Sequence, residues 1–589
     1  MRVHFLNSYT LADLAELSRT TEPILPVRYD GGLALLGPVI GAGPGVCLEC
    51  AEHARLTRLG APRDPRLRLG GRPTPASKPL LHELIQKITA SPAEYLRTVV
   101  AVRTDLGTTS HHRVRSRPEG CPVCRPLPLD SPEHIVSLPI PVRPGSLREP
   151  NPLTDGDSLH AELFDLRHGP VVGVFHSGHL PLAVASAELV GDNAAPEAGF
   201  GRTVDFTDAE RVALYEAVER FSSMRPRRAT TATKASYAEL GPDRALDPVR
   251  LGRYDPEHVA HSAFHLRPYS PDAQTRWVFG WSYTERKPIA VPEHVAYWAT
   301  NDPSQFIAET SNGCGLGNNL TEAVLHGLFE VAERDAFLMA WYAKTPLRPI
   351  RLPADPVLPH LADRLESLGY TLMFFDATND LGIPAVISVA KYLGENMDTP
   401  MIYYAAGAHP DPRRAMLSAA AEVAVDVEAA ADRVAAAPEL YSRRRLLRLL
   451  AEPESIRTMH EHVAVNGLPE AADRHEFLVD GGLPEIEIED LASVPHLADL
   501  RLMLDYFVGH LRQLGLEIIA VDQTDPATSN ELGLHSAKVI VPGTLPMTFG
   551  HLYRRTLGLP RLLEVPHQLR RVPAVPPYTA LSLQPHPFP

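Results

Sequence analysis

The sequence predicts an α+β or mixed α/β protein in which a smaller α/β domain precedes a larger one. The chain has 589 residues, which is too long for one simple hydrophobic core. Four of its five cysteines lie in the first quarter of the chain, and from about residue 156 short apolar segments alternate with long helical ones. We therefore expect a first domain at 1–155 and a second at 156–589.

The expected elements follow from apolar runs and from their punctuation by Gly and Pro. In the first domain we expect strands at Ala34–Pro38 and Thr98–Val102 and a helix at Pro79–Ile88. The Pro- and Gly-rich segment Pro139–Asp157 predicts a linker, and Leu159–Val174 reads as helix, turn and strand. Later strands are expected at Leu372–Phe375, Ala385–Val389, Met401–Ala405, Leu516–Val521 and Lys538–Val541. Long helices are expected at Asp208–Ser223, Asn319–Tyr342 and Arg413–Ala436.

Four cysteines form two CxxC pairs, Cys47 with Cys50 and Cys121 with Cys124. Two such pairs are the usual ligand set of a tetrathiolate zinc site, and four thiolates leave no open coordination position for chemistry. The two pairs are further apart than in small zinc fingers, so we expect a structural Zn²⁺ that closes the first domain. Two unrelated CxxC pairs, or redox thiols, are the alternatives.

The helix expected at Asn319–Tyr342 carries its polar residues along one line. These residues are spaced four, four, three and one apart, and they are Glu322, His326, Glu330, Glu333 and Arg334. At 3.6 residues per turn they form a single stripe, and most of the remaining helix is apolar. A solvent-facing helix carries a wide polar face. The pattern therefore predicts a buried helix whose carboxylates need a cation.

Two further helices carry acidic residues on one face. Glu216, Glu219 and Arg220 lie together in the first, and Glu422 and Asp426 are four apart among alanines and valines in the other. Buried like charges repel one another, so cations should pair with them. Carboxylate oxygens suit Mg²⁺, which accompanies phosphates, and arginine suits phosphate oxygens. For each helix taken alone, a salt-bridged surface is the alternative.

Charge and missing motifs exclude several classes of protein. The net charge of −14 argues against a nucleic-acid binder. No apolar run of 18 residues occurs, and the N-terminus lacks the pattern of a signal peptide, so we expect a cytoplasmic protein without a membrane partner. No G-x-x-x-x-G-K-[ST] loop occurs either, so any nucleotide is bound by something other than a P-loop.

Taken together, these features resemble the YcaO family. The resemblance rests on two E-x-x-E-R segments, the S-N-G-x-G-x-G loop at Ser311–Gly317, Asn318 with Glu322 four residues later, and the final P-H-P-F-P. The segments DATNDLGIPAV and IIAVDQT are also similar, and the resemblance covers roughly His160–Pro589. The cysteine-containing domain is similar to the E1-like part of azoline-forming cyclodehydratases in the biosynthesis of thiazole/oxazole-modified peptides and thiopeptides.

The resemblance implies an ATP-dependent enzyme that modifies a ribosomal precursor peptide. In that family, three acidic helices hold Mg²⁺ and the ATP phosphates. Carried over to this chain, the binding residues are Glu216, Glu219, Arg220, Asn318, Glu322, Glu330, Glu333, Arg334 and Glu422. The chain departs from the family at Val212, where Ser is usual, and at Ser418, where Gln is usual, which affects details of ATP contact. Arg202 stands where a basic residue is common.

The implied reaction forms azoline rings. A Cys, Ser or Thr side chain of the precursor attacks the preceding amide carbonyl, the γ-phosphoryl group moves to the backbone amide oxygen, and phosphate departs to leave a thiazoline or oxazoline. The resemblance also implies that the stiff C-terminal tail places the carboxylate of Pro589 in the site as a catalytic group. A frayed terminus is the alternative for this tail.

The resemblance also implies partners for this chain. Fused cyclodehydratases begin with a winged-helix module that binds the leader peptide, whereas only Met1–Val46 precede the first CxxC pair. We therefore expect a separate leader-peptide-binding partner that docks through the zinc domain, together with a homodimer. Thioamide or amidine formation within the same family, and a non-catalytic scaffold in a peptide-modifying complex, are the alternative functions.

Overall fold

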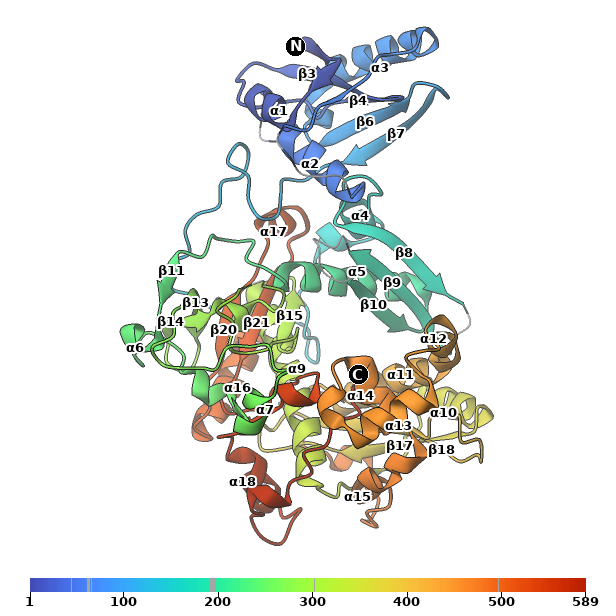
Figure 1. The fold of residues 1–589 in the computed structure, drawn as a ribbon, viewed down its shortest axis with the longest axis vertical. Coiled ribbons are helices and arrows are strands. Elements are labelled where there is room, and N and C mark those ends of the chain that lie inside the picture. Colours follow the sequence, from blue (N-terminus) through green and yellow to red (C-terminus); the bar gives the residue numbers. More distant parts are fainter. Residues whose placement is uncertain are drawn as a thin grey trace.

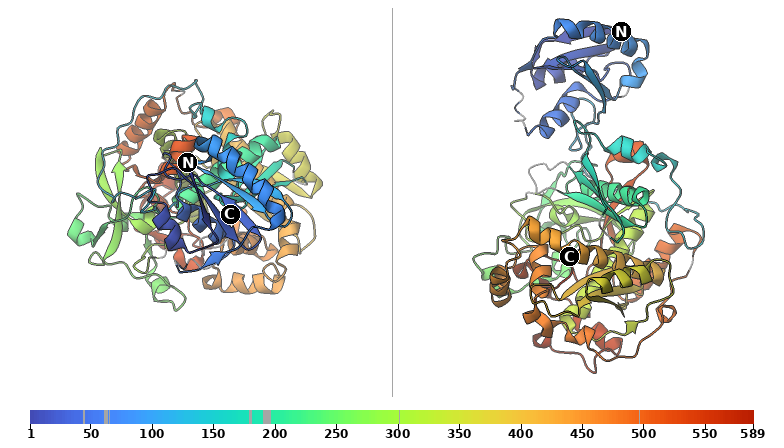
Figure 2. Two further views of the ribbon diagram at one scale, coloured as in Figure 1. Left: turned by 90° about the horizontal axis from the view of Figure 1, so that it is seen from above. Right: turned by 90° about the vertical axis from the view of Figure 1, so that its right-hand side faces the viewer.

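The computed structural model describes residues 1–589 except 44, 61–63, 65, 179–180, 190–196, 301 and 496. A small N-terminal unit, which contains the elements from β1 to β7, stands apart from a larger main body and meets it over a narrow region (Figure 1). A second view from the side shows the same division (Figure 2). No helix in the described part of the chain is long and apolar enough to cross a membrane.

The N-terminal unit is a five-stranded sheet with the order β1-β3-β4-β6-β7, in which β1 and β3 are parallel and the other pairs antiparallel. Alternate residues of the strands face two small cores. Helix α3 (Lys78–Ala90) covers one face, and α2 (Leu48–Arg58), which carries Cys50, covers the other. The strands are β1 (Arg2–Leu6), β3 (Ile24–Asp30), β4 (Leu33–Leu36), β6 (Thr98–Arg103) and β7 (Thr108–Arg113).

The main body contains three larger sheets. The first has the order β10-β9-β8, the second β11-β13-β20-β21-β15 with β14 added to β13, and the third β16-β17-β18-β19. Their strands are β8 (Val171–Ser177), β9 (Ala183–Leu189), β10 (Ala198–Thr203), β11 (Thr233–Ala235), β13 (Thr275–Ser282), β14 (Lys287–Pro292), β15 (Cys314–Gly317), β16 (Pro349–Ile350), β17 (Tyr370–Asp376), β18 (Ala385–Tyr392), β19 (Ile402–Ala408), β20 (Ile519–Asp522) and β21 (His535–Ile540).

Helix α9 (Leu320–Ala343) joins the second and third sheets. Its first half packs into the core that contains β20 and β21, and its second half into the core beneath β18 and β19. Helix α5 (Phe206–Ser223) packs on β9 and β10, and α11 (Pro412–Glu428) packs on β18 and β19. The three helices that carry the acidic residues therefore each belong to a different sheet and surround the centre of the main body (Figure 1).

The remaining elements are short or peripheral. The helices are α1 (Leu11–Leu17), α4 (Ser158–Leu163), α6 (Tyr237–Leu240), α7 (Pro256–Ala260), α8 (Glu293–Ala296), α10 (Leu358–Ser367), α12 (Ala430–Ala436), α13 (Arg443–Ala451), α14 (Met459–Asn466), α15 (Glu476–Val479), α16 (Leu500–Gln513), α17 (Pro526–Leu532) and α18 (Arg561–Gln568). The strands are β2 (Ser8–Tyr9), β5 (Leu69–Gly70), β12 (Arg253–Tyr254) and β22 (Arg555–Leu557).

The mixed α/β fold is confirmed, and the differences from the expected elements are local. The expected helix at Arg413–Ala436 is two helices that change direction at Ala429, where Arg433 of α12 turns back and donates to Asp426 at 3.1 Å. An alanine-rich run carries no residue that marks such a break. The strand expected at Ala34–Pro38 ends at Leu36, because Gly37 has a φ of +89° and leaves the ladder.

The expected linker Pro139–Asp157 contains no strand and only one short 3₁₀ turn, yet it is fixed to the main body. The Val142 N–H donates to the Ala498 carbonyl at 3.0 Å, and Leu500 donates to Ile140 at the same distance. The Asn151 side chain donates to the Leu532 carbonyl at 2.8 Å. The segment therefore runs along the surface of the main body as an ordered strap.

Candidate active site

The Gly-rich loop allows α9 to lie directly on β15. A Cβ added at Gly315 would lie 2.2 Å from the Ala323 carbonyl oxygen, and Gly313 adopts a φ of +80°. Asn319 caps the helix by accepting the Glu322 N–H at 2.9 Å. The glycines thus fix the start of α9 and the direction of its acidic stripe.

Glu330, Glu333 and Arg334 form the centre of this stripe. The Gly313 N–H donates to Glu330 at 2.9 Å, and the Arg334 guanidinium lies 3.6 Å from Glu330 and 3.4 Å from Glu333. Burial raises the pKa of Glu330, and burial together with nearby carboxylates raises the pKa of Glu333 from 4.5 to about 8. A single guanidinium therefore does not neutralise the two acids.

Helix α5 brings a second E-x-x-E-R segment to the same place. Arg220 pairs with Glu216 at 2.8 Å, which is the i,i+4 pairing expected of a surface helix. It also pairs with Glu197, outside the helix, at 3.2 Å. Glu219 has no such ion pair within the part of the chain that the structure describes. Burial and the nearby carboxylates of Glu330 and Glu216 raise the pKa of Glu219 well above its ordinary value. The electrostatic influence of Glu330 on Glu219 shows that α5 and α9 direct acids at each other.

Helix α11 supplies the third acid, Glu422. Its carboxylate lies 3.9 Å from the guanidinium of Arg202 on β10, and burial raises its pKa. Its electrostatic neighbours include Arg334 and Glu216, so it faces both of the other helices. Ser418, one turn earlier on the same helix, and Val212, one turn before Glu216 on α5, are the two positions that depart from the family pattern.

Seven of the nine residues expected to bind ATP and Mg²⁺ therefore meet in one cluster. Five carboxylates there face three guanidinium groups, those of Arg202, Arg220 and Arg334. Such an excess of buried acid is stabilised by protonation or by a divalent cation with oxygen ligands. The donor set of this carboxylate cluster fits Mg²⁺, and the arginines are suited to the phosphates that accompany it.

Asn318 and Glu322 lie elsewhere, at the start of α9. The Asn318 side chain donates to the Glu149 carbonyl at 2.7 Å, and Glu322 accepts the Glu149 N–H at 3.1 Å. Burial raises the pKa of Glu322 to about 7, and one of its oxygens has no hydrogen-bond partner among the described residues. Since α9 rises about 1.5 Å per residue, Glu322 stands roughly 16 Å from Glu333 along the helix. Only an elongated ligand reaches both ends of the stripe.

One supporting residue is absent from the sequence-based expectations. Lys538 of β21 is 2% exposed, and it donates to Glu309 at 3.0 Å and to the carbonyl oxygens of Thr310 and Asn312. It thereby fixes the loop whose Gly313 N–H binds Glu330. The sequence reads at this point as a plain apolar strand, so it gives no signal of this role.

The C-terminal tail is fixed beside the carboxylate cluster and is not frayed. Phe588 is fully buried, its ring packs 4.7 Å from the ring of Phe337, and the Arg334 guanidinium lies 4.2 Å above it. The buried His586 donates to the Thr548 carbonyl at 2.9 Å. An Arg334 N–H lies 3.4 Å from the main-chain oxygen of Pro589. Pro589 therefore stands at the edge of the carboxylate cluster.

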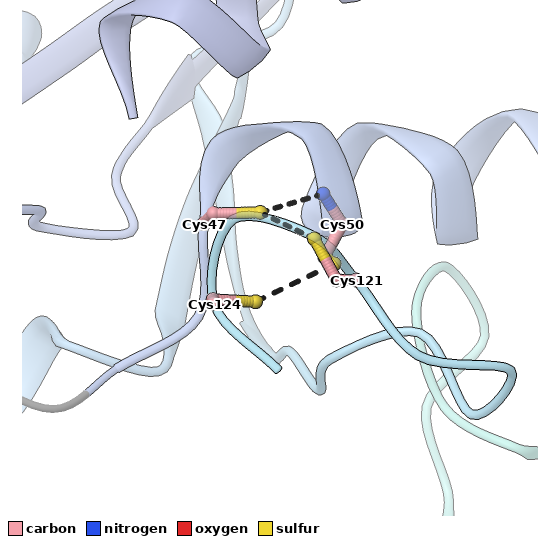
Figure 3. Close-up of side chains that lie close together, drawn as sticks. All are labelled: Cys47, Cys50, Cys121 and Cys124. Carbon is pink, nitrogen blue, oxygen red and sulfur yellow. Dashed lines mark hydrogen bonds between the residues drawn. The ribbon is translucent and has the colours of Figure 1, made fainter. Parts of the chain in front are cut away.

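The four paired cysteines of the N-terminal unit converge on one point (Figure 3). The sulfurs of Cys47 and Cys121 are 3.6 Å apart, and those of Cys50 and Cys124 are 3.7 Å apart. Tetrahedral Zn–S bonds of about 2.3 Å place sulfurs roughly 3.8 Å from one another, and all four cysteines are free of disulfides. The residues fit Zn²⁺, and the Cys50 and Arg117 N–H groups directed at the sulfurs suit thiolates.

Comparisons with known proteins identify the family of this chain. The family model described as YcaO cyclodehydratase, ATP- and Mg²⁺-binding, matches residues 200–545. An uncharacterized protein from the tfuA 3′ region of Rhizobium leguminosarum bv. trifolii is 30% identical over 264 residues. The matched residues are 41% of this chain and 58% of that protein, so this chain spans less than two thirds of the relative. An uncharacterized protein of Methanothermobacter thermautotrophicus is 26% identical over 351 residues, which are 58% of this chain and 80% of that protein.

Two solved structures share the fold over the whole chain. A heterocyclase in complex with substrate and cofactor has a TM-score of 0.77 at 21% identity and is covered over 81% of its length. The heterocyclase TruD has a TM-score of 0.68 at 20% identity and is covered over 79%. Because the family model spans more than half of the chain and includes all three acidic helices, the chain belongs to the YcaO family of ATP- and Mg²⁺-binding cyclodehydratases.

Proposed function

We propose that this chain uses ATP and Mg²⁺ to convert Cys residues of a ribosomal precursor peptide into thiazolines, with Ser and Thr as further candidate nucleophiles that give oxazolines. The observation that carries the proposal is the cluster of five carboxylates and three guanidinium groups from three helices and strand β10. The raised pKa values of Glu219, Glu330 and Glu422 mark sites that favour a bound cation.

The reaction needs an activated amide oxygen. The peptide side chain adds to the preceding carbonyl, and the oxygen that results is a poor leaving group until ATP supplies a phosphoryl group. Phosphate then departs as the C=N bond of the ring forms. The balance is one ATP and one side-chain–amide pair consumed, and one azoline, ADP and phosphate formed.

The residues of the chain have separate tasks in this scheme. The carboxylates of Glu219, Glu330, Glu333 and Glu422 are the candidate Mg²⁺ ligands, and bound Mg²⁺ offsets the charge of the triphosphate. Arg220 and Arg334 orient phosphate oxygens and stabilise the charge that develops during transfer. The raised pKa values imply that these acids lose protons when the cation binds.

Pro589 is the candidate group for removing the amide proton. Its main-chain oxygen faces Arg334, which also pairs with Glu330 and Glu333, so this end of the tail borders the phosphate-binding residues. The buried ring of Phe588 holds it there. A carboxylate at this place accepts a proton without moving far.

The test combines nucleotide turnover with mass spectrometry of a co-expressed precursor peptide. Peptide-dependent ADP release and a loss of one water mass per ring are expected for the wild type. Glu330→Ala should abolish both, whereas Glu366→Gln, an exposed acid on α10, should change neither. Ring formation by Glu330→Ala contradicts the proposal. A product in which sulfur has replaced an amide oxygen, without water loss, indicates thioamide formation. A water loss that persists when the Cys, Ser and Thr residues of the precursor are replaced indicates amidine formation. The absence of peptide-dependent turnover indicates a scaffold.

A further inference from the structure

We propose that His112, Asp165 and His168 bind a second transition-metal ion, best suited to Zn²⁺, that joins the N-terminal unit to the main body. His112 lies on β7 of the N-terminal unit. Asp165 and His168 lie in the turn between α4 and β8 of the main body. The three side chains meet where the two units approach one another, and this site is independent of the proposed catalysis.

The spacing of the donor atoms fits a metal ion. One donor atom from each residue lies within 4.8 Å of the others. The Nδ1 atom of His112 is 3.0 Å from an oxygen of Asp165, and the Nδ1 atom of His168 is 3.8 Å from the other oxygen. Bonds of about 2.0–2.1 Å in a tetrahedral zinc site place donors roughly 3.3 Å apart. The two observed distances, 3.0 and 3.8 Å, lie on either side of this value. The sulfur–sulfur distances of the four cysteines are likewise close to the value expected for zinc.

His168 provides the decisive observation. Its side chain is 1% exposed, and neither ring nitrogen has a hydrogen-bond partner among the residues that the structure describes. A buried polar group without a partner costs about 1–3 kcal/mol, so such groups usually mark an ion or a water. A simple His112–Asp165 hydrogen bond accounts for two of the three residues and leaves this ring unexplained.

The surroundings orient the ligands. The Nε2 atom of His112 is 2.6 Å from the Ser110 hydroxyl, and its Nδ1 atom faces the Asp165 carboxylate. Such a second partner on the other ring nitrogen is usual for metal-bound histidine. The Asp165 carboxylate accepts the N–H groups of Arg167 and His168 at 2.8 and 2.9 Å, so its position is fixed. Arg58 donates to the main-chain carbonyls of Asp165 and Gly169.

The donor set selects the metal. Two imidazoles and one carboxylate suit Zn²⁺ and its neighbours, whereas Mg²⁺ prefers oxygen ligands only. His168 also lines a cavity of about 110 Å³ next to Cys50 and Arg117, from which a water molecule can complete the coordination. The ion would thus differ from the Mg²⁺ of the carboxylate cluster.

The experiment measures metal content of the full chain after growth with zinc and removal of free metal. Two zinc ions per chain are expected for the wild type, and one for His168→Ala. The matched control is His111→Ala, an exposed neighbour of His112 on β7, which should keep two. One zinc in the wild type, or two in a folded His168→Ala protein, overturns the proposal.

A second measurement does not depend on the folding of the variant. Wild-type chain stripped of metal and titrated with Co²⁺ should bind two equivalents, only one of which shows thiolate-to-metal charge transfer. The other should show ligand-field bands without charge transfer, because its donors are nitrogen and oxygen. Saturation at one equivalent, with charge transfer throughout, overturns the second site.

Discussion

Replacing Glu333 by Gln should stabilise the protein in the absence of Mg²⁺ and ATP. Its side chain is 15% exposed, and burial with neighbouring acids raises its pKa from 4.5 to about 8. A carboxyl group whose pKa is raised on folding destabilises the folded state as pH rises above its unfolded pKa. The loss begins near pH 4.5, grows to about pH 8 and is constant above that value.

The magnitude follows from the two pKa values. Each pH unit between the two pKa values is worth about 1.4 kcal/mol. At pH 7, Glu333 is protonated in the folded state and ionised in the unfolded state, which lowers the free energy of unfolding by roughly 3 kcal/mol relative to low pH. This is an upper bound because neighbouring acids titrate together with Glu333. Glutamine does not titrate, so Glu333→Gln should be more stable than the wild type at pH 7 by up to this amount. The difference should vanish near pH 4.5.

Urea unfolding at pH 5 and pH 8, with and without Mg²⁺ and ATP, measures this effect. Without ligands, the variant should have the higher midpoint at pH 8, and the difference between the two midpoints should be much smaller at pH 5. With ligands the order should reverse, because only the wild type gains from the cation. Glu366→Gln, on the exposed face of α10, controls for the general effect of removing an acid. Equal midpoints at pH 8 without ligands refute the reasoning.

Three further predictions concern the zinc site, the tail and the partner. Cys47→Ser combined with Cys121→Ser should lose one zinc ion and destabilise the N-terminal unit; a fully folded variant with unchanged metal content, measured by metal analysis and circular dichroism, contradicts the tetrathiolate site. Removing Pro589 alone keeps the buried Phe588 but moves the carboxylate, so ring formation should fall by about 10²- to 10⁴-fold with little change in nucleotide affinity. If ring formation and nucleotide affinity fall equally, the tail has a structural role only. The chain alone should process precursor slowly, and a leader-peptide-binding protein should restore the rate; tight leader binding by the isolated chain excludes this division of labour.

The long acidic helices were predictable because their signal is local. The period of 3.6 residues places Glu322, Glu330 and Glu333 on one line whatever the rest of the chain does, and the observed helix begins within one residue of its expected start. The two CxxC pairs are also local signals. The structure brings all four cysteines together, as expected, but the bound ion stays a prediction. Helix α5 begins two residues early because Asp205 caps it.

The contacts between distant elements could not be predicted. The sequence gives no reason for Lys538 of β21 to be buried and to bind Glu309, since each residue is ordinary in its own segment. The same holds for Arg202 and Glu422, which meet only because β10 lies beside α11. His112 and Asp165 come from the two different units. Tertiary packing decides these pairs, and one sequence does not reveal it.

Arg334 links the C-terminal tail to the acidic helix α9. One face of its guanidinium lies on the buried ring of Phe588, and its N–H groups face Glu330, Glu333 and Pro589. A ligand that draws Arg334 toward phosphate oxygens therefore acts on the tail through the same side chain. Conversely, the buried tail restricts the positions that Arg334 can adopt, so it orients this charge before any ligand binds. In the proposed reaction, Arg334 would therefore couple nucleotide binding to the placement of Pro589, and phosphorylation and proton removal at one amide would need such a coupling.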